Sequence, residues 1–355
     1  MKKLLKIITL VYFIFSSVGI ASESTSGNNK MLKLLDLLNQ SMEEIKVING
    51  FERESDCNCE HRINEFFPTN SLLESALKIE LIGIKDFDIE GIKTNITSIL
   101  IKLESTIKKY KNNLSDEDSA VSFILEIEQI LEDNNFWFDD YKPTIRDTFK
   151  IQSGFGFNCF TKSLLILHIT ELYNLPIKGI LVPDHFFLQI QTNKGHINWE
   201  ITSKKNRMPS DDFYRTHFEV SPYLEKANIE MTPLSKEQIL AEVYNNTYLH
   251  CKDLNTKQIL INLAIKNSPK NPYFLGRRGT VFQDLGQFEK AINDYSLIIK
   301  MYPAMYLPYY SRAVNYKNVG QNKLAKRDLE YLIKNFKEQL SKQDLIEVTE
   351  EIKKL

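Results

Sequence analysis

From residue 235 onward the chain repeats itself with a period of about 34 residues, and this feature constrains the fold more than any other. Pro269 and Pro303 lie one period apart, and so do Gly286 and Gly320. The same offset relates Arg278 to Arg312, Gly279 to Ala313, Phe282 to Tyr316, Leu285 to Val319, and Ala291 to Ala325. Small residues that recur at a fixed offset let paired helices approach closely. The pattern therefore predicts stacked helix pairs.

The period and the residue pattern resemble the tetratricopeptide repeat, a unit of two antiparallel helices. Counting back from Pro269 gives a more degenerate unit, with Tyr244, Tyr248, Ile261 and Ala264 at the expected positions. We therefore expect about three units over residues 235–339 and a C-terminal helix or cap over 340–355. The resemblance implies a protein partner on the repeats. Arg277, Arg278 and Arg312 are candidates for that contact, although ordinary helix-surface charge is the simpler interpretation. Of Tyr302, Tyr306, Tyr309, Tyr310 and Tyr316, some must be repeat core and others are candidates to line the groove.

The stretch 1–21 has the pattern of an export signal. Lys2 and Lys3 precede an almost wholly apolar stretch, residues 7–21, which ends in small residues. This stretch is shorter than the ~20 residues that a spanning helix needs. We therefore expect a cleaved signal peptide, no stable membrane span after cleavage, and a periplasmic or extracellular location in a bacterium.

The sequence of residues 22–132 predicts a helical N-terminal region. Residues 71–82 and 94–110 carry apolar side chains at helical spacing, and Ser71 is a plausible N-cap. Ser115–Asp118 predicts the start of a further helix. The formal net charge of -1 excludes the strong basic excess typical of nucleic-acid binders.

Residues 133–234 hold the candidate chemistry. Cys159 opens an apolar helical run, His185 starts a strand-like run at 185–191, and Glu200 lies in a second such run at 196–202. A helix start favours thiolate, a histidine takes the proton, and a carboxylate orients the histidine. The order of elements predicts a helix followed by an antiparallel sheet, which is an α+β core. We expect the segment after it, 203–233, to be irregular.

Each of these residues has an alternative interpretation. Cys159 alone would most often be a buried small side chain, His185 a turn histidine, and Glu200 a solvent-facing strand residue. His196 is a rival to His185, and Asn198 is a rival to Glu200 because residues two apart on a strand share a face.

The remaining cysteines and histidines carry weaker signals. His168 predicts a packed helix residue. Cys57 and Cys59, with the nearby His61, lack four ligands at a familiar zinc spacing. They indicate an exposed acidic loop, with or without a disulfide, and Cys251 has no assigned partner. No metal or organic cofactor is implied.

Three segments together resemble the transglutaminase-like cysteine superfamily, which shares its core with papain-like proteases. They are Gly156-x-x-Cys159, Pro183–Leu188 and Asn198–Thr202. A helical region before the core and tetratricopeptide repeats after it resemble a bacterial branch of that superfamily. The resemblance implies that Cys159 is the nucleophile, His185 the base and Glu200 the orienting acid, where many relatives have Asp.

The expected function is cysteine acyl transfer, with hydrolysis of an amide or peptide preferred over cross-linking and a protein or peptide as substrate. The backbone N–H of Cys159 is the candidate oxyanion donor. The alternative is a non-catalytic protein-binding scaffold, in which the cysteine core is degenerate and the repeats carry the function, as in bacterial relatives that have lost the cysteine. A purely structural envelope protein is a third hypothesis.

Overall fold

A computed structural model describes residues 67–82, 88–134, 136–138 and 155–355. The expected signal peptide, the segment from residue 22 to 66, and Cys57 and Cys59 lie outside the described residues. Within the described part of the chain, no helix has the length and apolar character needed to cross a membrane.

Before the candidate core, the described residues form helices α4 (Leu72–Glu80), α5 (Ile89–Tyr110) and α6 (Glu117–Asp133). Helix α5 begins earlier than the apolar spacing predicts because Asp88 accepts a hydrogen bond from the Gly91 N–H and caps it there. Asp116 caps α6 in the same way through the Ser119 N–H. Ser71 precedes α4, but its side chain makes no capping bond.

Two short parallel strands then frame the start of the next helix. Strand β1 (Phe136–Phe138) pairs with β2 (Phe155–Phe157). Helix α8 (Cys159–Tyr173) follows at once and ends at Asn174, which adopts the left-handed conformation that asparagine tolerates.

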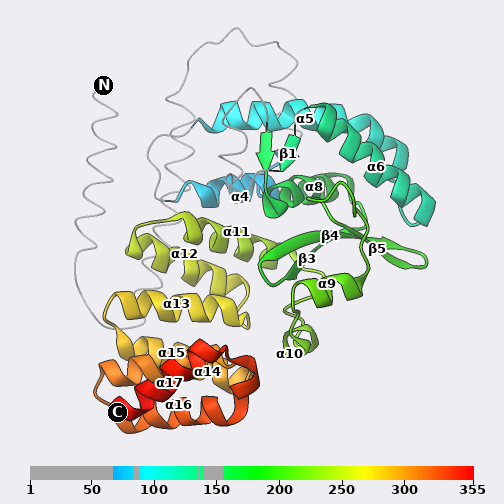
Figure 1. The fold of residues 1–355 in the computed structure, drawn as a ribbon. Helices are drawn as coiled ribbons and strands as arrows, with labels where there is room; N and C mark the ends of the chain where they lie inside the picture. Colours follow the sequence, from blue (N-terminus) through cyan, green and yellow to red (C-terminus); the bar gives the residue numbers. More distant parts are fainter. Residues whose placement is uncertain (1–66, 83–87, 135, 139–154) are drawn as a thin grey trace, which may run out of the picture. The chain divides into compact units, whose positions relative to one another are not determined.

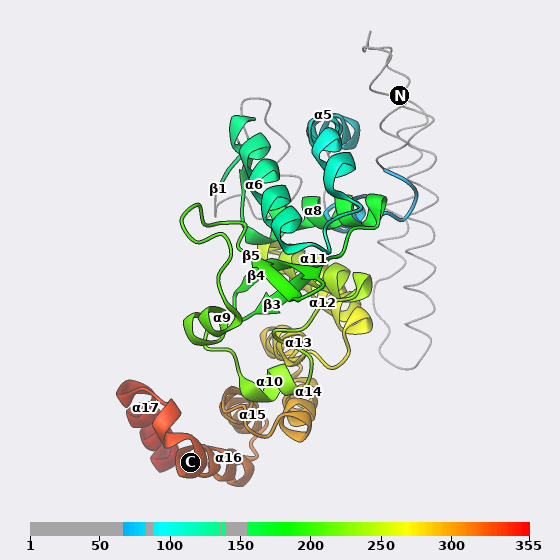
Figure 2. The ribbon, with the colours of Figure 1, turned by 90° about the vertical axis from the view of Figure 1, so that its right-hand side faces the viewer.

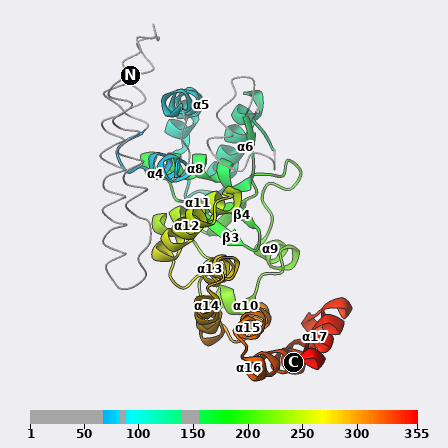
Figure 3. The ribbon, with the colours of Figure 1, turned by 90° about the vertical axis from the view of Figure 1, so that its left-hand side faces the viewer.

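The predicted antiparallel sheet is present. It consists of β3 (Ile177–Val182), β4 (His185–Thr192) and β5 (Gly195–Trp199), in the order β3-β4-β5. Both of its faces are covered (Figures 2 and 3), with α8 and the layer of α5 and α6 on one side and α9 on the other. Leu188 packs on the first side and Phe187 on the second, as the alternation of a strand requires.

The segment after the sheet is more ordered than the sequence predicts. It forms α9 (Asp211–His217) and α10 (Pro222–Lys226). Ser210 caps α9 through the Phe213 N–H, and Pro222 stands at the first turn of α10, where a proline costs no hydrogen bond. These signals are short and local, which explains why helical periodicity did not reveal them.

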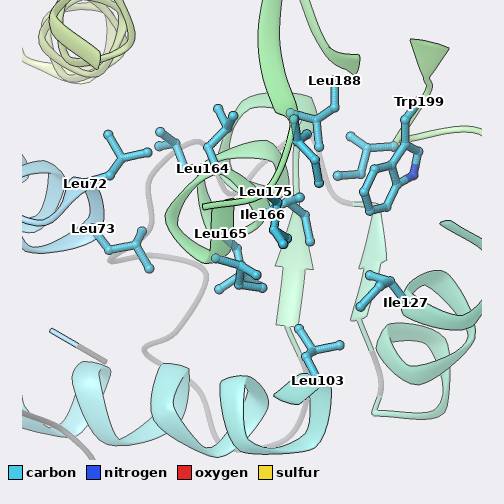
Figure 4. Packing of buried hydrophobic residues seen from close by; sticks show 14 of the residues in the cluster. Leu72, Leu73, Leu103, Ile127, Leu164, Leu165, Ile166, Leu175, Leu188 and Trp199 are labelled. Atoms are coloured by element: carbon cyan, nitrogen blue, oxygen red, sulfur yellow. The ribbon is translucent and has the colours of Figure 1, made fainter. Parts of the chain in front are cut away.

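Helix α8 is the centre of the larger core. Figure 4 shows Leu164, Leu165 and Ile166 of α8 among side chains from α4, α5, α6, β4 and β5: Leu72, Leu73, Leu103, Ile127, Leu188 and Trp199. All of these side chains are buried. The end of α8 that carries Cys159 is therefore fixed to a rigid layer.

The C-terminal part consists of helix pairs (Figure 1). The pairs are α11 (Lys236–His250) with α12 (Leu254–Asn267), α13 (Pro272–Asp284) with α14 (Phe288–Met301), and α15 (Leu307–Asn318) with α16 (Asn322–Phe336). A 3-10 turn (Lys337–Gln339) and α17 (Lys342–Lys354) follow.

The repeat period has clear structural causes. Gly286 and Gly320 each follow the first helix of a pair with φ of 69° and 74°, a conformation that favours glycine. Gly279 and Ala313 lie where the two helices of a pair meet, and a Cβ at Gly279 would stand 2.8 Å from Cζ of Tyr295. Helix pairing thus requires small residues at this position.

The recurring arginines are structural, not free surface charge. Arg278 donates two hydrogen bonds to Asp294 and one to Asn262, and Arg312 donates two to Asp328 and one to Ser296. Each arginine therefore joins both helices of its own pair to the second helix of the preceding pair. Arg277 donates to Asn245 on the neighbouring first helix. The interpretation as plain helix-surface charge was wrong for Arg278 and Arg312.

The described residues therefore form a mostly helical protein with a small antiparallel sheet and an array of helix pairs whose sequence period resembles the tetratricopeptide repeat. A papain-like or transglutaminase-like core is not shown and stays a prediction, as do the domain boundaries.

Candidate functional site

Cys159 occupies the first position of α8. Asn158 accepts a hydrogen bond from the Thr161 N–H at 2.9 Å, and Thr161 Oγ1 accepts one from the Asn158 N–H at 3.2 Å. This capping box fixes where the helix begins. The N–H of Cys159 is one of the amides at a helix start that have no intrahelical acceptor, and the partial positive charge there favours an anion. The Cys159 side chain is partly exposed.

His185 is the first residue of β4. Asp184 before it adopts a positive φ of 52°, which makes the sharp turn from β3. Phe218, just after α9, stacks on the imidazole with ring centroids 4.6 Å apart and planes within 3° of parallel. The turn at Asp184 and the stacked Phe218 ring therefore restrict the orientation of the His185 imidazole.

Glu200 follows the last residue of β5, so it lies just beyond the strand where the sequence placed it. Its Oε2 is 2.8 Å from Nε2 of His185 and accepts a hydrogen bond from the Tyr214 hydroxyl at 3.0 Å. Its Oε1 accepts from the Thr202 N–H at 3.0 Å and from the Thr202 hydroxyl. Glu200 is 5% exposed, and the bonds just described satisfy both oxygens of its buried carboxylate.

These contacts set the charges of the site. Burial alone would lower the pKa of His185, but the adjacent Cys159 and Glu200 side chains raise that pKa to about 9. Burial opposes the charge of Glu200 as well, yet His185 and Thr202 hold the pKa of this carboxyl below its usual value. At neutral pH the site therefore favours an imidazolium beside a carboxylate.

The structure brings Cys159, His185 and Glu200 together, and it gives the rivals other partners. His196 contacts Asp211 at 3.0 Å, and Asn198 donates to Asp211 and to the Pro209 carbonyl. His168 is fully buried in α8, as predicted.

A buried ion-pair network supports the turn that carries Glu200. Glu128 of α6 accepts hydrogen bonds from Lys162 of α8, from Arg207, and from the Trp199 indole. Lys162 also donates to the carbonyl of Ile201, and the Arg207 carbonyl accepts from the Glu200 N–H at 2.7 Å. Sequence reasoning missed this network, because its members lie far apart along the chain and share no local motif.

Tyr214 and Phe218 were also not recognised from the sequence as parts of this site. Helix α9 is only two turns long and too short for a periodic signal. Its local signs were the Ser210 cap, the acidic first turn and the basic last turn. No cluster of side chains suited to a metal ion occurs among the described residues.

The repeat array holds a second feature, a contact with the rest of the chain. Leu224 of α10 and Ile229 are buried in one cluster with Leu275 and Phe282 of α13. The Tyr273 hydroxyl at the start of α13 donates to Glu230. We call residues 224–230 the docked segment. One repeat period after Tyr273, Leu307 begins α15 and is 58% exposed.

No protein-family model matches the chain. A UPF0162 protein of Buchnera aphidicola subsp. Baizongia pistaciae is 22% identical over 270 residues, which cover 68% of this chain and 90% of the relative.

Solved structures with some likeness include two TPR domains and menin. The TPR2AB domain of yeast Sti1 in complex with pHSP90 is 16% identical, with a TM-score of 0.31, and covers 84% of this chain and 96% of its own. The Sgt2 TPR domain from Aspergillus fumigatus is 20% identical, with a TM-score of 0.29, and covers 34% and 78%. Menin is 11% identical, with a TM-score of 0.39, and covers 73% and 68%.

Proposed function

We propose that this protein is a protein-binding scaffold whose repeat array holds a segment of a partner polypeptide. The observation that carries this proposal is the docked segment. The array already holds a short polypeptide stretch on α13, through buried aliphatic side chains and the Tyr273–Glu230 hydrogen bond. Helix arrays present such surfaces repeatedly along their length.

The next first helix in the array exposes two neighbouring side chains near its start. Leu307 and Tyr310 on α15 stand one repeat period after Tyr273 and Gly276, and their side chains are exposed by 58% and 38%. On α13 the first of these positions contacts the docked segment. Leu307 stands where Tyr273 does but carries no hydroxyl, so we expect the partner of α15 to be an extended or briefly helical segment with aliphatic side chains, and any hydrogen-bond acceptor on it to meet the Tyr310 hydroxyl.

Site-specific photo-crosslinking tests this proposal. A benzophenone amino acid at Tyr310 is compared with the same group at Tyr331 on α16, which is 42% exposed and so matches it in accessibility. We expect a discrete protein adduct from position 310 that Leu307→Asp removes, and none from position 331. Equal adducts at both positions, or adducts insensitive to Leu307→Asp, would contradict a specific surface on α15.

A second candidate function rests on a separate observation, the geometry of Cys159, His185 and Glu200. A cysteine at a helix start, an imidazole beside it and a buried carboxylate 2.8 Å from Nε2 are the parts of an acyl-transfer centre. Since Glu200 takes Nε2, Nδ1 is the ring nitrogen that remains for the thiol.

In that reaction the thiol proton already resides on the His185 imidazolium, and the Cys159 thiolate attacks an amide or thioester carbonyl. The Cys159 N–H at the start of α8 faces developing negative charge on the carbonyl oxygen. His185 then protonates the leaving group, and an acyl-enzyme forms. Water, activated by the same imidazole, releases the acid and restores the thiol. A protein or peptide is the substrate class.

Alkylation of Cys159 by iodoacetamide tests this second function. The other three cysteines, Cys57, Cys59 and Cys251, are changed to Ser, so that Cys159 is the sole thiol. At pH 6.5 a thiol of ordinary pKa, ~8.5, is about 1% ionised and reacts slowly. We expect fast alkylation at that pH, slowed about tenfold or more by His185→Ala. Slow alkylation in both proteins would refute the centre and leave the scaffold function in place.

A further inference from the structure

Helix α9 places one residue, Tyr214, directly against the candidate centre. Tyr214 is fully buried, and its ring stacks on Phe187 of β4 with centroids 3.6 Å apart and planes within 8°. Ser210 caps the helix and fixes its start. The phenol ring therefore has little freedom, and its hydroxyl is a fixed point on the face of the sheet that also carries His185.

The Tyr214 hydroxyl contacts the candidate centre at one atom, Oε2 of Glu200. Oε2 of Glu200 accepts from Tyr214 at 3.0 Å and lies 2.8 Å from Nε2 of His185. Glu200 stands after the end of β5, so the strand ladder does not fix its side chain. Thr202 holds the other carboxylate oxygen, Oε1. The direction of Oε2 is thus set by two groups, the His185 ring and the Tyr214 hydroxyl, and both are held by aromatic stacking.

We propose that Tyr214 is a positioning residue, whose hydroxyl holds Oε2 of Glu200 against His185. The proposal rests on the cysteine centre, the second function proposed above. Without the hydroxyl, a buried carboxylate loses one donor, favours its neutral form and supports the imidazolium less. Loss of the hydroxyl should therefore weaken the His185 imidazolium in the same direction as loss of the Glu200 charge, but by a smaller amount.

The test is the pH at which alkylation of Cys159 by iodoacetamide reaches half its maximal rate, in the full chain with Cys159 as its sole cysteine. Glu200→Gln, which removes the charge, should raise this midpoint. Tyr214→Phe should raise it by about half to one unit, because one hydrogen bond to a charged group is worth about one to two pKa units at Glu200 itself and only part of this reaches the thiol through His185. Tyr302→Phe, which deletes a phenol bonded to the Lys270 carbonyl in the repeats, is the control and should leave the midpoint unchanged.

The outcomes separate the two proposals. If His185→Ala and Glu200→Gln move the midpoint and Tyr214→Phe does not, or moves it downward, Tyr214 is not a positioning residue. If none of the variants moves the midpoint, the cysteine centre fails, and this inference fails with it. Should Tyr214→Phe not fold, 3-fluorotyrosine at 214 keeps the ring and the hydroxyl while making the phenol a stronger donor. A stronger donor to Oε2 should lower the midpoint, the opposite of the effect of Tyr214→Phe. An unchanged or raised midpoint would overturn the proposal.

Discussion

The change Glu128→Gln should destabilise the protein far more than the same change one helical turn later at Glu132. Glu128 is a buried anion shared by Lys162 and Arg207, and its side chain is 3% exposed, whereas that of Glu132 is 26% exposed. Removing one partner of a buried ion pair costs about 3–5 kcal/mol, because the other charge is left uncompensated.

The structure favours the lower end of that range. Arg207 keeps its hydrogen bond to Glu132, and Lys162 keeps the Ile201 carbonyl. We therefore expect a loss of about 3 kcal/mol for Glu128→Gln, and under about 1 kcal/mol for Glu132→Gln, which breaks a more exposed pair. With a urea slope of about 3 kcal/mol/M, the midpoints should fall by about 1 M and by less than about 0.3 M.

Equilibrium urea unfolding followed by tryptophan fluorescence measures this difference. In a Trp137→Phe background, Trp199 is the sole tryptophan, and its indole donates directly to Glu128. Both variants keep side-chain volume, so packing does not separate them. Midpoints that agree within about 0.3 M would refute the argument that burial of the Glu128 network determines its contribution.

Two further predictions concern pH and helix packing. The pKa of His185 is raised from 6.5 to about 9 on folding, so its stabilising contribution is complete below pH 6.5 and lost as the pH rises through 9. The urea midpoints of wild type and His185→Gln should therefore converge between about pH 6.5 and 9.5, and a constant gap would be inconsistent with that linkage. Gly279→Ala should destabilise the repeats by about 1–3 kcal/mol, because its Cβ would stand 2.8 Å from Tyr295. Gly276→Ala should leave stability unchanged or raise it, because a Cβ there would lie 3.8 Å from Cδ1 of Ile298, an ordinary contact. Thermal unfolding of both variants measures the difference.

The sequence revealed the repeats because their physical cause recurs. Gly286 and Gly320 are needed for a positive φ and Gly279 for close helix contact, so the same residue types return at a fixed spacing. Cys159 and His185 lie at a helix start and a strand start, as the sequence predicts, because such starts are marked by local features. Glu200 was identified as a residue, although its place beyond the end of β5 was not.

What the sequence did not reveal depends on distant contacts. Glu128 supports the turn at Glu200 only after α6 packs against the sheet, and no local pattern marks that partnership. Tyr214 lies on a two-turn helix, which is too short for apolar periodicity to show. Arg278 and Arg312 were misassigned because the sequence of one repeat does not show that the preceding helix pair packs against these side chains. Without that packing, a charged residue on a helix surface is expected to face solvent.

The connection from residue 210 to 231 has a consequence for how such a chain is divided. Tyr214 completes the packing on one face of the sheet, while Leu224 and Ile229 complete a cluster of the repeats. A cut between Tyr214 and Leu224 leaves the first with the sheet and the second with the repeats, whereas a cut after Ile229 takes both Leu224 and Ile229 from the array. A graft of this array onto another protein would therefore have to carry the docked segment, residues 224–230, with it.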